Sequence, residues 1–171
     1  LNLKGEEVPD LKKWNTFLNN LNNPKNTINI ALVGKYVELK DSYISIAEAL
    51  IHAGANNQTK TNIHWIHSSK IETNNSLLEL QNMDGILVAP GFGERGIEGK
   101  IAAVKYAREN NIPFLGICLG MQCAVVEFAR NVIILDDANT TEIKADCSSP
   151  VIDMMKEQKQ LKNMGGTMRL G

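Results

Sequence analysis

The segment PFLGICLGMQ, residues 113–122, carries the most information about the fold of this 171-residue chain. A short apolar run precedes Cys118, and apolar residues recur at helical spacing over residues 119–130, so the cysteine lies where a strand turns sharply into a helix. Gly116 and Gly120 flank Cys118 two positions before and two positions after it, in the layout of a nucleophile elbow with cysteine in place of serine. Such a turn is tight, and a Cβ atom at either glycine would collide with neighbouring backbone.

The elbow predicts that Cys118 is a nucleophile. The turn would raise the sulfur above the sheet, and the N-terminus of the following helix favours a thiolate over a thiol. Free N–H groups at Leu119 and its neighbours can hold a developing oxyanion. The alternative is a small core cysteine before an ordinary strand-to-helix turn, which is the interpretation we give to Cys123 on the same helix. Cys147 lies in a polar loop and lacks the elbow setting.

Short apolar strands alternate with amphipathic helices along the rest of the chain. Strands are expected at residues 28–33, 63–66, 86–89, 112–117 and 132–135, and helices within residues 11–21 and at 41–54, 75–80, 97–110 and 119–130. This order predicts an α/β fold of three layers, with a mainly parallel sheet and helices on both faces. The strands do not alternate with polar residues, as expected for strands buried on both sides. Ligands of such sheets bind beyond the carboxyl ends of the strands.

Composition excludes several classes of function. Net charge is −1, from 18 Lys and Arg against 19 Asp and Glu, so a nucleic-acid partner has little support. No apolar run is long enough to span a bilayer, and no leader segment is visible, so we expect no membrane association and a cytoplasmic location. The three cysteines show no CxxC spacing, which argues against a disulfide framework or a zinc site.

Four segments together resemble one family, the class I glutamine amidotransferases, and within it the amidotransferase domain of CTP synthases. They are GKYVELKDSY at 34–43, FGERGIEGK at 92–100, GICLGMQ at 116–122 and GGTMRLG at 165–171. The resemblance runs from about residue 28 to residue 171, and it implies a flavodoxin-like fold. It also implies glutamine hydrolysis through a Cys-His-Glu triad, with the ammonia passed to a second active site that converts UTP to CTP.

The resemblance implies a role for individual residues. Cys118 would be the nucleophile. The glutamine site would comprise Gly91, Leu119, Gly120, Met121, Gln122 and Glu142, of which Glu142 would bind the α-amino group. Gly91 and Leu119 would supply the oxyanion N–H groups, since Pro90, which stands where the family often has glycine, has no N–H. A lid that responds to GTP, the family's allosteric activator, would involve Arg95, Tyr36 and Lys40.

The resemblance also predicts what these residues lack. The family's triad His and Glu lie in a His-x-Glu motif beyond the GGTMRLG segment, where this chain stops, and His52, His64 and His67 are not placed to substitute for it. We therefore expect residues 1–27 to be a linker with a short helix and residues 28–171 to be a C-terminally incomplete amidotransferase domain that is inactive alone. Because the chain begins with leucine, we expect a piece of a longer protein.

In that longer protein, the resemblance implies an N-terminal synthetase domain that binds ATP and Mg²⁺ and forms a homotetramer. The amidotransferase domain itself would need no cofactor or metal. Two alternatives are another enzyme on the same scaffold, such as a γ-glutamyl hydrolase or a GMP synthase subunit, and a non-catalytic regulatory module. The segments at 35–43 and 92–100 argue against the first, and a His-x-Glu motif downstream would exclude the second.

Overall fold

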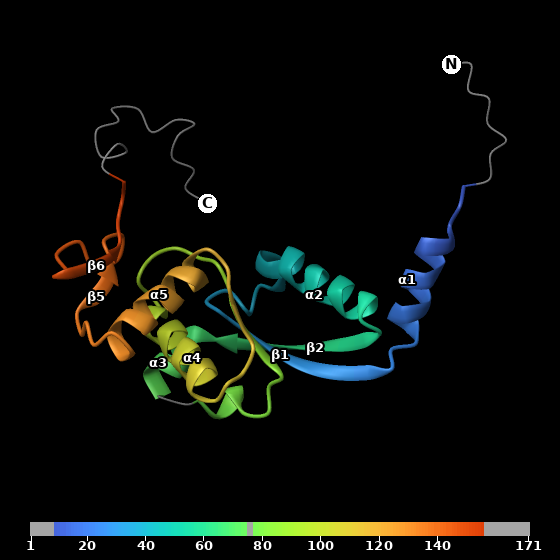
Figure 1. Ribbon diagram of the computed structural model, residues 1–171, viewed down its shortest axis with the longest axis horizontal. Helices are drawn as coiled ribbons and strands as arrows, with labels where there is room; N and C mark the ends of the chain where they lie inside the picture. Colours follow the sequence, from blue (N-terminus) through green and yellow to red (C-terminus); the bar gives the residue numbers. More distant parts are fainter. Residues whose placement is uncertain (1–8, 75–76, 156–171) are drawn as a thin grey trace, which may run out of the picture. The chain divides into compact units, whose positions relative to one another are not determined.

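A computed structural model describes residues 9–74 and 77–155, and it contains a four-stranded sheet (Figure 1). The strands are β1 (Asn26–Gly34), β2 (Thr59–His67), β3 (Gly85–Val88) and β4 (Phe114–Gly116), and their order in the sheet is β2-β1-β3-β4. The pairs β1/β3 and β3/β4 are parallel. This order is that of flavodoxin-like sheets, and the predicted α/β class with a mainly parallel sheet and helices is confirmed.

The strand register places three loops at the same edge of the sheet. Val33 pairs with Val88, and Val88 pairs with Gly116. The residues that follow these three strands therefore emerge side by side. They include Lys35 after β1 and Cys118 after β4.

The described residues form two compact units, one from residues up to Ile28 together with Ile44–Asn62, and one from Asn29–Tyr43 together with residues from Ile63 onward. The first unit contains α1 (Lys12–Asn22) and α2 (Ile44–Asn56). The ring of Phe17 on α1 stacks on Trp14 at 5.6 Å and meets His52 of α2 edge-on at 5.5 Å. The short helix predicted in the N-terminal segment is present, and its role as a linker stays a prediction.

The second unit holds the main core, which lies between β1, β3 and the helices α3 (Ser68–Asn74), α4 (Ile97–Glu109) and α5 (Leu119–Asn131). Buried members of this core come from all of these elements, among them Ala31, Val33, Ile71, Ile86, Val88, Ala103, Cys123 and Val126. Glu127 of α5, only 1% exposed, accepts hydrogen bonds from Nε of Arg108 of α4 at 3.1 Å and from Nη2 at 2.8 Å. Burial of the helix faces and this ion pair together hold α4 against α5.

The prediction of a strand at residues 132–135 is wrong. These residues form a turn bonded to the end of α5: the N–H groups of Val132 and Ile133 both donate to the carbonyl of Phe128, and Ile134 has a φ of 64°. The apolar run resembles a strand, but its backbone hydrogen bonds return to the helix. The next strand is β5 (Ala138–Thr140), which pairs in parallel with β6 (Ser149–Ile152) in a separate two-stranded sheet.

Two further predictions need correction or lie outside the described residues. Of the helix expected at 75–80, the structure describes only a 3₁₀ turn at Leu78–Leu80, while the helix α3 just before it was not predicted. Another 3₁₀ turn, Lys40–Tyr43, precedes α2. The GGTMRLG segment at residues 165–171 lies outside the described residues.

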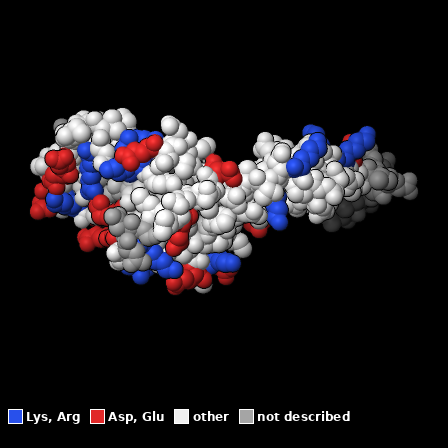
Figure 2. All heavy atoms as spheres, turned by 90° about the horizontal axis from the view of Figure 1, so that it is seen from below, with Lys and Arg blue, Asp and Glu red and all other residues white. Residues whose placement is uncertain are grey.

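The surface and helices show two general features. On the face in Figure 2, acidic and basic side chains are intermixed in small groups, and uncharged surface separates one group from the next. Among the described residues, no helix combines the length and the apolar character needed to cross a membrane.

Candidate active site

Cys118 occupies the strained turn that the sequence predicts. It has φ 52° and ψ −110°, immediately before the first residue of α5, and its side chain is exposed. A Cβ on Gly116 would lie 2.6 Å from the backbone of Gly120, and a Cβ on Gly120 would lie 2.1 Å from the carbonyl oxygen of Val88. Both distances are far below van der Waals contact, so the predicted need for glycine at these positions is confirmed. A non-glycine residue with positive φ is uncommon and is concentrated at functional sites.

Backbone hydrogen bonds fix the elbow to the sheet. The N–H of Ile117 donates to the carbonyl of Val88 at 3.1 Å, and the N–H of Gln122 donates to the carbonyl of Cys118 at 3.1 Å. Within the described part of the chain, the N–H of Leu119, at the first position of α5, donates to no other backbone group. This N–H is therefore available to an anion next to Cys118.

Two lysines hold the loop after β3, which carries Gly91. Nζ of Lys100 donates to the carbonyl oxygens of Ala89 at 2.7 Å and Pro90 at 3.5 Å. Nζ of Lys35 donates to the carbonyl oxygens of Phe92 and, at 3.0 Å, Gly93. The loop is thus bound to α4 on one side of Gly91 and to the end of β1 on the other.

Burial perturbs both lysines. It lowers the pKa of Lys100 to about 8, and it lowers the pKa of Lys35, with a further contribution from the nearby charge of Arg95. Sequence reasoning assigned neither residue a role. A signal was present for Lys100, because it lies on the inward stripe of α4 with Ile97, Ile101 and Val104, where a charged residue is unexpected.

The residues expected to line the glutamine pocket differ in exposure. Leu119 and Gly120 are buried, whereas Met121 is half exposed. Oε1 of Gln122 is buried and has no hydrogen-bond partner among the described residues. The contribution of Gly120 is close packing of α5 on β3, since it offers no side chain to a ligand.

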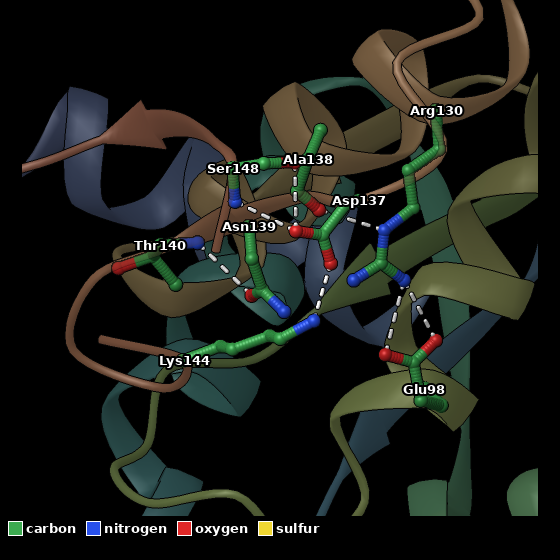
Figure 3. Close-up of polar contacts among 8 residues, drawn as sticks. All are labelled: Glu98, Arg130, Asp137, Ala138, Asn139, Thr140, Lys144 and Ser148. Carbon is green, nitrogen blue, oxygen red and sulfur yellow. Dashed lines mark hydrogen bonds and ion pairs between the residues drawn. The ribbon is translucent and has the colours of Figure 1, made fainter. Parts of the chain in front are cut away.

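Glu142 lies in the loop between β5 and β6, and a network at the base of this loop fixes its ends (Figure 3). Asp137 accepts hydrogen bonds from the N–H of Ser148 at 2.7 Å, from Oγ of Ser148 at 3.0 Å and from Nζ of Lys144. These bonds, with Lys144 first, lower the pKa of Asp137 to about 2. Glu142 itself is exposed, and its N–H donates to Oγ1 of Thr140 at 3.2 Å.

A second part of the same network connects this loop to both helices that follow the site loops. Nε of Arg130, near the end of α5, donates to the carbonyl of Ala138 in β5 at 2.8 Å. Its Nη1 donates to both carboxylate oxygens of Glu98, in the first turn of α4, at 2.9 and 3.0 Å (Figure 3). The strand before Glu142 is therefore coupled to α5, the helix that follows Cys118, and to α4, the helix that follows the 92–96 loop.

The three residues expected near a lid are only partly brought together. Arg95 is exposed and acts on Lys35, next to Tyr36, so the loops at 35–36 and 92–96 meet. Lys40 instead lies over the ring of Trp65 in β2, with Nζ 5.9 Å from the ring centroid. No contact in the described residues joins it to Arg95.

The two histidines of β2 have local partners. Nε2 of His64 lies 3.1 Å from Oδ1 of Asn29, and Nδ1 of His67 accepts from the N–H of Ser69 at 3.2 Å. Both lie on β2, at the edge of the four-stranded sheet, and β1 and β3 lie between this strand and β4, as expected for histidines at the edge or surface.

Comparisons with known proteins agree with this geometry. The family model for "Glutamine amidotransferase class-I" matches residues 38–171. Similar proteins include the CTP synthases of Cytophaga hutchinsonii, 62% identical over 171 residues, and of Methanocaldococcus jannaschii, 59% identical over 177 residues. Each alignment covers all of this chain, and it covers 32% and 33% of the respective relative. The chain thus spans about a third of the length of these relatives.

A solved structure gives the same result. The glutaminase domain of Trypanosoma brucei CTPS with bound acivicin is 38% identical, with a TM-score of 0.71, and the match covers 75% of this chain and 50% of that one. The family match extends over most of the present sequence, including the elbow and the loop after β3, and it begins after the loop at 35–36. The chain belongs to the class I glutamine amidotransferase family, and its matched relatives are CTP synthases.

Proposed function

We propose that this chain is the part of a CTP synthase that hydrolyses glutamine, with Cys118 as the nucleophile. The observation that carries the proposal is the strained, exposed position of Cys118 at the start of α5, with φ 52° and a glycine on either side. A core cysteine has no need of a positive φ or of solvent access. The other two cysteines are buried, and burial raises the pKa of Cys123 to about 11.

The reaction would be an acyl transfer. The Cys118 thiolate attacks the carboxamide carbon of glutamine, and the resulting oxyanion accepts hydrogen bonds from the N–H groups of Gly91 and Leu119. Ammonia leaves with a proton from a general acid, which the family resemblance assigns to a His beyond residue 171. Water then cleaves the thioester and releases glutamate. Glu142 would bind the α-amino group of glutamine through its carboxylate.

The destination of the ammonia belongs to the longer protein. Its synthetase domain would bind ATP and Mg²⁺, activate UTP and accept the ammonia to form CTP, and it would assemble the homotetramer. GTP would act as an activator near Arg95 and the Tyr36 loop, where Lys35 already connects the two segments. Because Lys40 lies over Trp65, we favour Arg95 and Tyr36 over Lys40 as residues that respond to GTP.

The test treats the longer protein, which includes the length that its relatives have beyond this chain, with a diazo-ketone analogue of glutamine that alkylates a reactive thiol. The reagent should label Cys118 far faster than Cys123 or Cys147, as read by mass spectrometry of the three peptides. Glutamine should protect Cys118 from labelling, and Cys118→Ala should reduce ammonia release from glutamine by more than about a thousandfold. Preferential labelling of Cys123, or glutaminase activity retained by Cys118→Ala, would exclude the proposal.

A further inference from the structure

Lys100 is a fully buried charged side chain that the proposed chemistry does not use. It is 0% exposed on the inward face of α4, among residues of the main core. A buried ammonium is costly unless it is compensated, and lysine is rarely found in such a place. Its compensation here comes from two backbone carbonyls, those of Ala89 and Pro90.

Those carbonyls directly precede Gly91. The next two residues, Phe92 and Gly93, turn their carbonyl oxygens toward Lys35. Gly91 lies between the two ammonium groups, and a Cβ at this glycine would meet Cε of Lys35 at 3.4 Å and Nζ of Lys100 at 3.6 Å. In the described part of the chain, the N–H of Gly91 donates to no other backbone group. The lysines therefore fix the carbonyls of the loop and leave this N–H unused.

The ionisable groups that act on Lys100 come from the elbow, α5 and the loop after β1. Lys100 interacts favourably with Cys123 and Cys118 and unfavourably with Lys35. Cys123, which also faces Glu98 and Arg130, has its pKa raised to about 11 by burial and is a neutral thiol near pH 7. Lys35 faces Arg95 and carries the same sign of charge. The hydrogen bonds to Ala89 and Pro90 are therefore the geometric contacts through which Lys100 acts.

We propose that Lys100 is a positioning residue for the hydrolysis of glutamine, which holds the Gly91 loop in its oxyanion-binding conformation. The inference rests on the proposed function of Cys118. The role depends on one atom: Nζ binds the carbonyls before Gly91, and β3 in turn binds the elbow through the hydrogen bond from Ile117 to Val88. A neutral side chain of the same length would fill the space and lose the hydrogen bonds to the loop.

The experiment measures kcat and KM for ammonia release from glutamine, and the rate at which iodoacetamide alkylates Cys118, in the protein at the full length of its relatives. Lys100→Met should lower kcat by about ten- to a hundredfold with little change in KM, because the oxyanion forms only after glutamine has bound. The alkylation rate should stay the same, because alkylation forms no oxyanion. Lys105→Met, on the same helix with a 46% exposed side chain, is the matched control and should leave all three quantities unchanged.

Lys100→Gln keeps a hydrogen-bond donor without the charge, and it provides a second variant if the methionine protein does not fold. Lower kcat with unchanged alkylation of Cys118 in either folded variant supports the proposal. Unchanged kcat in every folded variant, or equal falls in kcat and in the alkylation rate, overturns it, because a merely structural role would disturb the elbow as well. Absence of ammonia release by the unmodified protein would instead refute the proposed function of Cys118.

Discussion

A methyl group on Gly120 would place its carbon 2.1 Å from the carbonyl oxygen of Val88, because the first turn of α5 lies directly on the end of β3. This contact positions the elbow: it sets how far Cys118 stands above the sheet. The same carbonyl accepts the hydrogen bond from Ile117, so a displacement of α5 would also break that bond.

Gly120→Ala should therefore destabilise the protein and disable the site. Overpacking of this kind costs about 1–3 kcal/mol, and the backbone oxygen of Val88 cannot rotate away as a side chain would. We expect a lower melting temperature and slower labelling of Cys118 by a glutamine analogue. Val125→Ala, at a 40% exposed position of the same helix, is the control and should change both little. Wild-type labelling by Gly120→Ala would show that α5 does not need this close approach.

Substitutions of Glu142 and Asp137 should separate two contributions to glutamine binding: the contact with the amino group of glutamine and the geometry of the loop between β5 and β6. Glu142→Gln should raise KM for glutamine at least about tenfold, because a charge pair with the substrate amino group is lost, while ammonia-dependent synthesis of CTP by the longer protein stays intact. Asp137→Asn should raise the same KM through loss of the bonds that hold the loop at Lys144 and Ser148. An unchanged KM in the first variant would exclude the role of Glu142.

Asp137→Asn should also change how the stability of the protein depends on pH. The folded-state pKa of Asp137 lies near 2, below its ordinary value of 3.8. Its contribution to stability is therefore present above about pH 4 and is lost as pH falls toward 2. Acid unfolding of the unmodified protein should include this contribution, and Asp137→Asn should unfold with a smaller change in stability between pH 4 and pH 2.

Lys100 should make the stability of the protein depend on pH in the alkaline range. Its folded-state pKa is lowered to about 8 from 10.5, so the unfolded state holds the proton more tightly between these values. Stability should rise as pH increases from about 8 to 10.5, and the burial cost should be fully present below pH 8. Between pH 7.5 and 9.5 the gain from this group is on the order of 2 kcal/mol. Urea denaturation at pH 7.5 and 9.5 should show this gain in the free energy of unfolding for the unmodified protein and not for Lys100→Met.

The ion pair between α4 and α5 predicts an asymmetry between its two partners. Glu127 is 1% exposed, whereas the side chain of Arg108 is 35% exposed. Arg108→Met leaves a buried carboxylate without its partner, but Glu127→Gln leaves an arginine that water can solvate. The first variant should therefore lower the melting temperature more than the second. Ammonia release at low temperature should be similar in both, since neither residue contacts the site loops. Equal melting temperatures would mean that water or another group reaches Glu127.

The elbow and the parallel sheet were predictable from sequence because each depends on local pattern. Gly116 and Gly120 at fixed offsets from Cys118 specify a tight turn whatever surrounds it, and apolar runs separated by helices specify a parallel sheet. The strand predicted at 132–135 failed because an apolar run does not reveal where its backbone hydrogen bonds go; here they return to α5. Lys35 was not identified because its contacts with Phe92 and Gly93 join segments far apart in the sequence. Lys100 was missed although its place on the inward stripe of α4 was a signal.

The 171 residues studied alone should turn over glutamine far more slowly than the longer protein. The elbow, Gly91 and Leu119 can favour the thiolate and the tetrahedral intermediate, but they cannot protonate ammonia or activate the water that cleaves the thioester. General acid–base steps of this kind contribute about 10²–10⁴-fold. Of the three histidines, His52 lies beside Phe17 and Glu48 in the first compact unit, and His64 and His67 lie on β2 with partners of their own. The measurement is ammonia release by both proteins at equal concentration, with the chain length confirmed by mass. Diazo-ketone labelling of Cys118 in the short chain shows that the elbow is formed. Comparable rates of turnover would mean that a general acid lies within these residues and that its assignment to a His beyond residue 171 is wrong.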